Sequence, residues 1–394
     1  MLDDNNLRMK IIVLTTSLSR GGITSFMIPL VNFLIEENHD VTLAYTIDEG
    51  NYIDRISNKV HKLQYKTYGK YSRLFRYIRK NAILDVLKIV LRKKNAIPKY
   101  SSIQRVAYID AENIYITDQK YDVAISTAEG FCNAVVANNI VADKKIGWIH
   151  PDMKSLGLDI RKGTSILNKY DYIVSVSQSG CTTLKAFFPN ERKKIVHIDN
   201  MIDSDYIRMK SMIRIDDMYN AVNGRTLVTV CRIANESKRL DRIVSIADNL
   251  KEQHFNFKWY IIGDGPDYNM LDSLIKSKSL TDKVILLGAR NNPFPYIKKA
   301  DYFVLTSQYE GKPVVVEEAK VLHTPIIVTN YSSARNQVTE KLGIVVDNSD
   351  ENLIEQMSDV IKSDCLLEKL RKSNASYNYD NTLIKEQLRT ILYN

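Results

Sequence analysis

A short stretch of the chain, residues 305–321 (LTSQYEGKPVVVEEAKV), combines two carboxylates with a predicted helix start. An apolar strand pattern ends before residues 311–313 (GKP), and Glu310 and Glu318 lie on either side of that break. The free N–H groups and positive dipole end of a helix attract phosphate, and carboxylates accept hydrogen bonds from the vicinal hydroxyls of a sugar. The stretch could hold both halves of a sugar nucleotide, or the two Glu could merely complement a helix dipole.

Other polar residues also follow predicted strands. Gly21 and Gly22 come after KIIVLTTSL, where backbone could approach a ligand closely or simply turn. His150 ends KIGWIH, and its imidazole could donate to a sugar hydroxyl or phosphate or be structural. Arg232 and Lys238 follow RTLVTVC and could hold a diphosphate, or be surface cations. None of these residues defines a site by itself.

The elements that must position these residues follow a regular pattern. Short β-rich apolar runs alternate with longer helical patterns, which is typical of parallel βαβ construction. One series runs from KIIVLTTSL to KIVHIDN, and a second runs from RTLVTVCRI to GIVVDN. We predict an α/β protein with two Rossmann-like, doubly wound parallel-sheet domains and a ligand cleft between them. The predicted parts are residues 1–204, residues 205–375 and a C-terminal helix, 376–394, that packs back on the first domain.

Composition limits the class of protein. The 394 residues are 44% hydrophobic and 26% charged, enough for a sizeable core in each domain. The four cysteines are far apart and lack CxxC or Cys/His spacing, so neither disulfides nor a zinc site are expected and the cytoplasm is the simplest location. The acidic N-terminus precedes an apolar run too short to span a membrane. No DxD-like site appears, so we expect neither a metal nor a cofactor.

The net charge of +9 is concentrated in one segment. Between Lys59 and Arg105 there are fourteen Lys or Arg and a single acid, Asp85. The segment contains NAILDVLKIVLRKKN (81–95), which resembles a basic amphipathic helix suited to an anionic membrane surface. A core helix with a solvated basic edge is the alternative, and no nucleic-acid partner is expected. The candidate membrane or acceptor residues are Arg76, Arg79, Lys80, Arg92, Lys93 and Lys94.

Taken together, these segments resemble the retaining glycosyltransferases of family 4, which have the GT-B fold. Glu310-x7-Glu318 in YEGKPVVVEEA is similar to the family's EGFP…EA element. GGITSF, VCRIANESKRLDRIV, IIGDGP and VILLGARNNPFPYIKKA occur in the family's order. Two departures stand out: Lys312 occupies a place where the family commonly has Phe or another apolar residue, and Arg232 and Lys238 are one residue further apart than in many members.

The resemblance implies a role for each matching residue. Glu318 would bind the ribose hydroxyls, Glu310 would contact the transferred sugar, and residues 288–291 would face the nucleobase. The implied catalytic residues are His150, Glu310, Arg232 and Lys238. The implied donor-binding residues are Gly21, Gly22, Arg232, Lys238, Gly288, Arg290, Asn291, Glu310, Gly311, Lys312, Pro313, Val314 and Glu318.

The resemblance also implies a reaction. We predict a metal-independent, retaining hexosyltransferase that moves a hexosyl or N-acetylhexosaminyl group from a nucleotide sugar, UDP rather than GDP, to a lipid-linked glycan for capsule, lipopolysaccharide or another envelope polymer. The enzyme would be cytoplasmic and peripheral at the inner face of the cell membrane. A sugar-nucleotide epimerase of GT-B fold and a catalytically silent assembly partner remain alternatives. A nicotinamide dehydrogenase is disfavoured because GGITS lacks the GxGxxG fingerprint.

Overall fold

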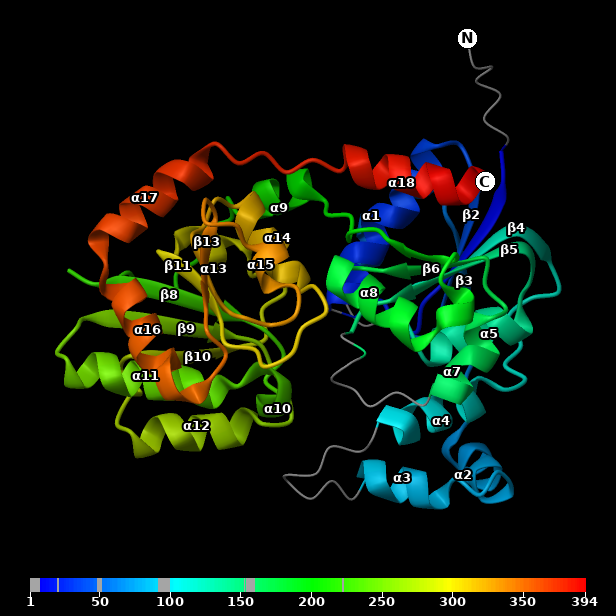
Figure 1. The fold of residues 1–394 in the computed structure, drawn as a ribbon, viewed down its shortest axis with the longest axis horizontal. Coiled ribbons are helices and arrows are strands. Elements are labelled where there is room, and N and C mark those ends of the chain that lie inside the picture. Colours follow the sequence, from blue (N-terminus) through cyan, green and yellow to red (C-terminus); the bar gives the residue numbers. More distant parts are fainter. Residues whose placement is uncertain are drawn as a thin grey trace, which may run out of the picture. The chain divides into compact units, whose positions relative to one another are not determined.

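The computed structural model of the chain describes residues 8–19, 21–47, 52–90, 100–151, 153, 160–221 and 223–394. The chain divides into two compact units (Figure 1). Unit 1 comprises residues 1–201 together with 381–394, and unit 2 comprises residues 202–380. The chain therefore returns to unit 1 with its C-terminal segment, residues 381–394.

Unit 1 contains a parallel sheet whose seven strands run in the order β3-β2-β1-β4-β5-β6-β7. This is a doubly wound order, and it reverses direction between β1 and β4, where such sheets bind ligands. The strands are β1 (Lys10–Leu14), β2 (Asp40–Tyr45), β3 (His61–Gln64), β4 (Lys120–Ser126), β5 (Val141–Ile149), β6 (Tyr172–Ser175) and β7 (Ile195–His197).

Helices cover both faces of this sheet because successive side chains of a strand point to opposite faces. Ile11 and Val13 pack in one core with α1 and α18, whereas Ile12 and Leu14 pack in another with α5, α7 and α8. The described helices of unit 1 are α1 (Gly22–Glu36), α2 (Lys70–Arg79), α3 (Ile83–Val90), α4 (Tyr100–Ala111), α5 (Phe131–Asn139), α7 (Ile160–Leu167), α8 (Gln178–Phe187) and α18 (Thr382–Tyr393).

Helix α18 is bound to unit 1 at its core and at its C-terminal end. Its residues Leu388 and Ile391 are buried in the cluster that contains Phe33 of α1. The Lys144 ammonium donates to the Leu392 carbonyl at 2.8 Å, where a cation also complements the helix dipole. These contacts tie the last segment of the chain to the sheet of unit 1.

Unit 2 contains a six-stranded parallel sheet with the order β10-β9-β8-β11-β12-β13, which reverses between β8 and β11. Its strands are β8 (Arg225–Val230), β9 (Phe257–Ile262), β10 (Val284–Gly288), β11 (Tyr302–Leu305), β12 (Ile326–Thr329) and β13 (Gly343–Val346). Its helices are α9 (Ser204–Lys210), α10 (Asn235–Lys238), α11 (Leu240–Glu252), α12 (Tyr268–Ser277), α13 (Phe294–Lys299), α14 (Val314–Val321), α15 (Ala334–Gln337), α16 (Asp350–Lys362) and α17 (Asp364–Ala375).

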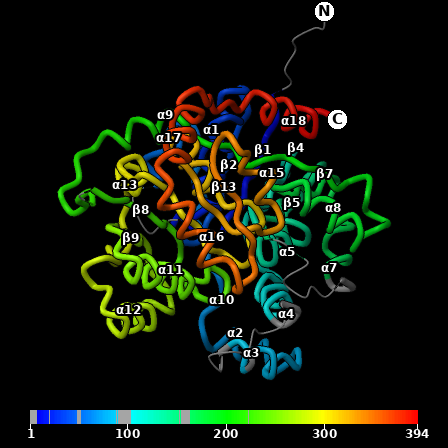
Figure 2. Tube along the Cα trace, turned by 60° about the vertical axis from the view of Figure 1, so that its left-hand side comes forward, coloured from blue at the N-terminus to red at the C-terminus, as the bar shows by residue number. Residues whose placement is uncertain are grey.

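The two faces of the unit 2 sheet also carry separate cores. Leu227 and Val304 pack with α11, α12, α16 and α17 on one face, and α11, α12 and α16 lie together there in both views (Figures 1 and 2). Val228 and Phe303 pack with α9, α13 and α14 on the other face. Helix α14 is therefore held from one side by the sheet, with its N-terminus directed to the loop that follows β11.

The prediction of two doubly wound parallel sheets is confirmed. The predicted apolar runs correspond to β1, β2 and β4–β7 in unit 1 and to all six strands of unit 2. Strand β3 (HKLQ) lacks an apolar run because it lies at the sheet edge with three of its four residues exposed. Within the described residues, no helix is both long and apolar enough to cross a membrane.

The packing of α18 gives a test on a single helix face. Leu388→Ala should lower the free energy of unfolding by about 2–4 kcal/mol, because it removes a buried side chain from the unit 1 core. Leu383→Ala, on the exposed face of the same helix, should change it by less than about 0.5 kcal/mol. Urea denaturation of both variants measures the difference, and equal effects would show that α18 is not packed in this way.

Candidate functional site

The centre of the candidate site is an ion pair at the point where the strand order of unit 2 reverses. Lys238 ends α10 in the connection that follows β8, and Glu310 lies in the loop that follows β11. The Lys238 ammonium donates to Oε1 of Glu310, and Ser307 Oγ donates to the same oxygen at 2.7 Å. Both charged side chains are mostly buried. Two residues 72 positions apart thus meet where ligands of such sheets bind.

The electrostatics of this pair keep it charged. Burial lowers the pKa of Lys238, but the charge and hydrogen bond of Glu310, together with Cys231, raise that pKa above its usual value, so the ammonium is retained near neutral pH. Burial raises the pKa of the nearby Cys231 thiol to about 12, which leaves that thiol protonated and unreactive. Burying such a pair costs desolvation free energy, and hydrogen bonds from a polar ligand offset part of that cost.

Arg242 of α11 holds the loop after β11 and the segment after β13. Its guanidinium is buried and donates to the Thr306 carbonyl at 3.2 Å and to Gln308 Oε1 at 2.9 Å, both in the loop after β11. It also donates to Asn348 Oδ1 at 2.6 Å and to Asp350 at 2.8 Å. Arg242 is therefore a positioning residue, and sequence analysis missed it because a lone Arg in a helix is usually solvated.

The Glu310–Pro313 loop is held from the segment after β12. Ser332 Oγ donates to the Glu310 carbonyl at 3.0 Å, and Gln337 Nε2 donates to the Pro313 carbonyl at 2.9 Å. Pro313 is the N-cap residue of α14, and no side chain caps that helix. Gly311, Lys312 and Val314 lie on this loop and in the first turn of α14. The N-terminus of α14 can therefore offer N–H groups to an anion.

The two adjacent carboxylates of α14 differ in their surroundings. Glu317 is buried and accepts from Lys320 Nζ at 3.1 Å and from Gln337 Nε2 at 3.0 Å, with Lys312 Nζ at 4.0 Å. This network explains the charged residue at Lys312, which departs from the family pattern. Glu318 is also buried, on the next position of the helix. Glu317 is thus a structural group, and Glu318 keeps the ribose-binding role as a prediction.

Arg232 lies on the tight loop after β8. Its side chain is exposed and makes no ion pair among the described residues. Gly263 (φ 152°) and Gly265 pack closely against this loop. A Cβ at Gly263 would lie 1.8 Å from the Cys231 carbonyl oxygen, and a Cβ at Gly265 would lie 2.2 Å from the Ile233 carbonyl oxygen. The glycines of IIGDGP therefore serve close backbone packing that presents Arg232.

The residues predicted to face the nucleobase lie at the end of β10. Gly288 has a positive φ of 69° and open space where a Cβ would be. Asn291 is exposed. Arg290, in contrast, is engaged: its guanidinium donates to Asp217 at 2.8 Å and to the Tyr296 hydroxyl at 3.3 Å. Arg290 therefore binds the segment between α9 and β8 through Asp217, and it binds α13 through Tyr296.

Unit 1 has an uncapped helix N-terminus of its own. Gly21 is the N-cap of α1, and Gly22 is its first residue, directly after the segment that follows β1. No side chain caps α1, its first turn contains no acid, and a Cβ at Gly21 would meet nothing within 4 Å. This uncapped N-terminus lies at the β1 side of the strand-order reversal and suits an anion.

His150 follows β5 and is fixed by three contacts. Its Nε2–H donates to the Thr127 carbonyl at 2.8 Å, its backbone N–H donates to Glu129 at 3.3 Å, and its ring packs edge-on against Phe26 of α1. A carbonyl only accepts, so Nε2 carries the proton, and the neutral ring presents Nδ1 as an acceptor. His150 can therefore accept from a sugar hydroxyl, rather than donate as sequence analysis expected.

The residues predicted for a membrane or acceptor surface are only partly available. Arg76 donates to the Glu112 carbonyl at 2.8 Å, and Lys80 pairs with the Glu112 carboxylate at 3.1 Å. Arg79 is exposed. Arg92, Lys93 and Lys94 lie outside the described residues.

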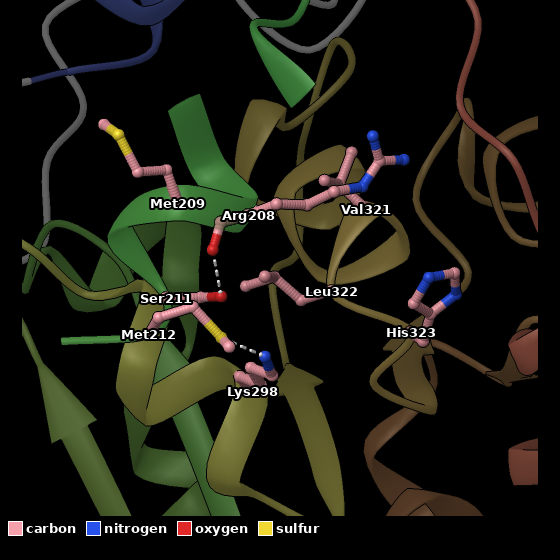
Figure 3. Close-up of a pocket in the computed structure, with 8 residues that line it drawn as sticks. All are labelled: Arg208, Met209, Ser211, Met212, Lys298, Val321, Leu322 and His323. Carbon is pink, nitrogen blue, oxygen red and sulfur yellow. Dashed lines mark hydrogen bonds between the residues drawn. The ribbon is translucent and has the colours of Figure 1, made fainter. Parts of the chain in front are cut away.

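A pocket of about 410 Å³ lies elsewhere in unit 2 (Figure 3). It is formed by α9, Lys298 of α13 and residues 321–323 at the C-terminal end of α14. Since α14 has eight residues, this pocket is about 12 Å along the helix from the Pro313 end. It does not include the residues around Lys238 and Glu310. Among the described residues, no group of three or more His, Cys, Asp or Glu is arranged to hold a metal ion.

Solved structures identify the fold class. A mutant of Staphylococcus aureus TarM, solved with fondaparinux, alpha-GlcNAc-glycerol and UDP, superposes with a TM-score of 0.69 at 14% identity, over 98% of this chain and 100% of that chain. HepE from Anabaena, solved with UDP, gives 0.65 at 15% identity, over 98% and 99%. At such identities the likeness shows the fold alone, and that fold is GT-B.

Sequence relatives identify the family. Residues 217–379 match the model of the glycosyl transferases group 1 family. The amylovoran biosynthesis glycosyltransferase AmsD of Erwinia amylovora is 25% identical over 381 residues, 95% of each chain. The N-acetylgalactosamine-N,N'-diacetylbacillosaminyl-diphospho-undecaprenol 4-alpha-N-acetylgalactosaminyltransferase of Campylobacter jejuni is 25% identical over 299 residues, 75% of this chain and 77% of the relative. Residues 217–379 thus belong to the glycosyl transferases group 1 family, family 4, and the chain is a glycosyltransferase of GT-B fold.

The environment of His150 predicts a specific pH dependence. Burial lowers the pKa of His150 from its usual 6.5, against the opposing effect of the Glu129 charge. Below about pH 6.5 the unfolded chain therefore binds a proton that the folded chain resists, so acidification favours unfolding, whereas stability is unaffected above this range. Between about pH 7.5 and 5.5, the wild type should lose up to about 1 kcal/mol more stability than His150→Gln. Equal pH dependence in urea denaturation would contradict this.

Proposed function

We propose that this glycosyltransferase is a retaining, metal-independent hexosyltransferase that moves a hexosyl or N-acetylhexosaminyl group from a nucleotide sugar to a lipid-linked glycan in envelope polysaccharide synthesis, including capsule or lipopolysaccharide. UDP is favoured over GDP as the nucleotide. The enzyme would act in the cytoplasm, peripheral at the inner face of the cell membrane.

The observation that carries this proposal is the Lys238–Glu310 pair at the reversal point of the unit 2 sheet. A diphosphate needs cations, and a sugar needs hydrogen-bond acceptors for its hydroxyls. Lys238 can supply the cation and Glu310 the hydrogen-bond acceptor, and these two side chains are in contact. Arg232, on the neighbouring loop, has an exposed guanidinium for the same diphosphate.

The proposed chemistry is stabilisation of a leaving group. As the bond from the sugar to phosphate breaks, the sugar gains positive character and the nucleoside diphosphate gains negative charge. Arg232, Lys238 and the N-terminus of α14 would stabilise that negative charge, with about 3–4 kcal/mol for each well-aimed donor where water is excluded. Family similarity implies attack of the acceptor hydroxyl on the face from which phosphate departs, its proton passing to a phosphate oxygen. Anomeric configuration would then be retained.

The resemblance to family 4 also assigns donor-binding roles to residues of unit 1, and we propose the same roles for them. The uncapped N-terminus of α1 at Gly21 and Gly22 would bind phosphate. The Nδ1 lone pair of His150 would accept a hydrogen bond from a hydroxyl of the transferred sugar. His150 would thereby orient the sugar while remaining neutral.

Names of related proteins support the substrate classes. TarM and HepE were both solved with UDP, which favours a uridine donor. The Campylobacter jejuni relative is named for transfer of N-acetylgalactosamine to a diphospho-undecaprenol glycan, and AmsD is named for amylovoran biosynthesis. An N-acetylhexosaminyl donor and a lipid-linked acceptor are therefore our first candidates.

A screen of common UDP-sugars and GDP-sugars tests the proposal without an acceptor. We expect one UDP-sugar to raise the melting temperature and to be hydrolysed slowly to UDP. A donor present at a hundredfold its Kd would stabilise the fold by about 2.7 kcal/mol. Stabilisation by GDP-sugars alone would overturn the choice of nucleotide, and conversion of the donor to an epimer would show an epimerase instead.

Adjacent carboxylates supply a matched control for this screen. Glu318→Gln should weaken donor binding by about tenfold, because it removes a charged acceptor for the ribose hydroxyls. Glu317→Gln should chiefly lower stability, because it weakens the buried contacts to Lys320 and Gln337. Isothermal titration and thermal melting separate the two effects. Unchanged donor affinity in Glu318→Gln would remove that residue from the site.

A further inference from the structure

Helix α2 is amphipathic, with its polar side toward the protein and its apolar side away from it. Two of its arginines bind the protein: Arg73 donates to Asp110 at 3.2 Å through Nε, and Arg76 donates to the Ile109 carbonyl at 3.2 Å. The Tyr77 hydroxyl, on the same face, donates to Asp110 at 2.8 Å. These contacts fix the rotation of α2 about its axis. The face opposite to them must therefore lie outward.

The outward face of α2 is apolar. Tyr71, Leu74, Phe75 and Ile78 recur with helical spacing, and their exposed fractions are 90%, 50%, 66% and 55%. We call these four residues the apolar ridge. Such a ridge is unfavourable in water, because the hydrophobic effect would place it inward if nothing covered it. Its outward position indicates a surface that is covered during function.

The charges around the apolar ridge indicate which kind of surface covers it. Lys66, Lys70 and Arg79 are exposed and make no ion pair among the described residues. The acids nearby are neutralised: Asp110 is bound to Arg73, and Glu112 is bound to Arg76 and Lys80. A second copy docked symmetrically on the ridge would bring an identical cationic rim against this one, which is repulsive. An anionic lipid surface is complementary to both the ridge and the rim.

We infer that α2 lies in the interfacial plane of an anionic membrane, with the apolar ridge inserted among the lipids and Lys66, Lys70 and Arg79 at the headgroups. Lysine and arginine stems suit that depth because their charged ends reach the polar layer. Aromatic rings such as those of Tyr71 and Phe75 suit the boundary between headgroups and acyl chains. The membrane surface depends on the proposed function in one respect only, which is that a lipid-linked acceptor would require the enzyme to work at a membrane.

This inference changes which residues carry membrane contact. Arg76 and Lys80, predicted from sequence as surface cations, instead hold α2 to residues 109–112. Their substitution should misplace the helix rather than remove a lipid contact. The ridge residues are at least half exposed and make none of these hydrogen bonds or ion pairs, so they can be changed without altering the contacts that hold α2.

A tryptophan reporter tests the insertion directly. The only two tryptophans of the sequence, Trp148 and Trp259, are both buried, so a new exposed one is readable by fluorescence. Phe75→Trp should shift its emission to shorter wavelength when vesicles of phosphatidylcholine with phosphatidylglycerol are added to the full chain. Tyr219→Trp is the control, because Tyr219 is 70% exposed and belongs to unit 2; its emission should not move.

A second variant measures how much the ridge contributes. Leu74→Ser with Ile78→Ser should weaken cosedimentation with the same vesicles by about tenfold or more, with an unchanged melting temperature. Absence of an emission shift in Phe75→Trp would overturn the proposal, as would equal binding to pure phosphatidylcholine vesicles. A shift that grows with protein concentration without vesicles, together with a doubled mass, would show that a second copy covers the ridge instead. Neither measurement uses a donor, so failure here leaves the donor screen unaffected.

Discussion

The site in unit 2 depends on one constraint, which is that a lysine and a glutamate from different βα loops share a mostly buried contact. Lys238 and Glu310 meet only because β8 and β11 are neighbours in the sheet and because Arg242 binds the loop after β11 from α11. A buried pair of this kind contributes little net stability, since desolvation offsets much of its attraction. Its contribution is geometric: it holds a cation and an acceptor side by side, as the proposed binding of a ligand with phosphate and hydroxyl groups requires.

The surrounding residues divide into those that would touch a donor and those that hold the loops. Gln337 illustrates the second kind: its amide binds the Pro313 carbonyl and Glu317, and its oxygen accepts from the Tyr331 hydroxyl at 2.8 Å. The loop that precedes α14 is thus fixed at both ends before any ligand arrives. A preorganised loop avoids an entropic cost on binding and aims its N–H groups at one place.

Sequence reasoning reached the sheets and the principal loops but not the contacts that hold them. Apolar runs with β-rich composition located twelve strands, and they missed β3 because an exposed edge strand carries no such run. Motif order pointed to Lys238 and Glu310, while nothing local distinguished the buried Arg242 from a solvated helix arginine. Charge counting failed around α2 for a related reason: Asp110 and Glu112 lie beyond the basic segment in sequence but pair with it in space.

The central claim is that Lys238 and Arg232 form a centre that binds the diphosphate of the donor. Calorimetric titration with UDP and with UMP tests it, using Arg232→Ala combined with Lys238→Met and Glu310→Gln so that the buried pair is neutralised as a unit. The account predicts that the wild type binds UDP at least about tenfold more tightly than UMP, and that the triple variant binds the two equally. A variant that kept the full preference for UDP would contradict the claim.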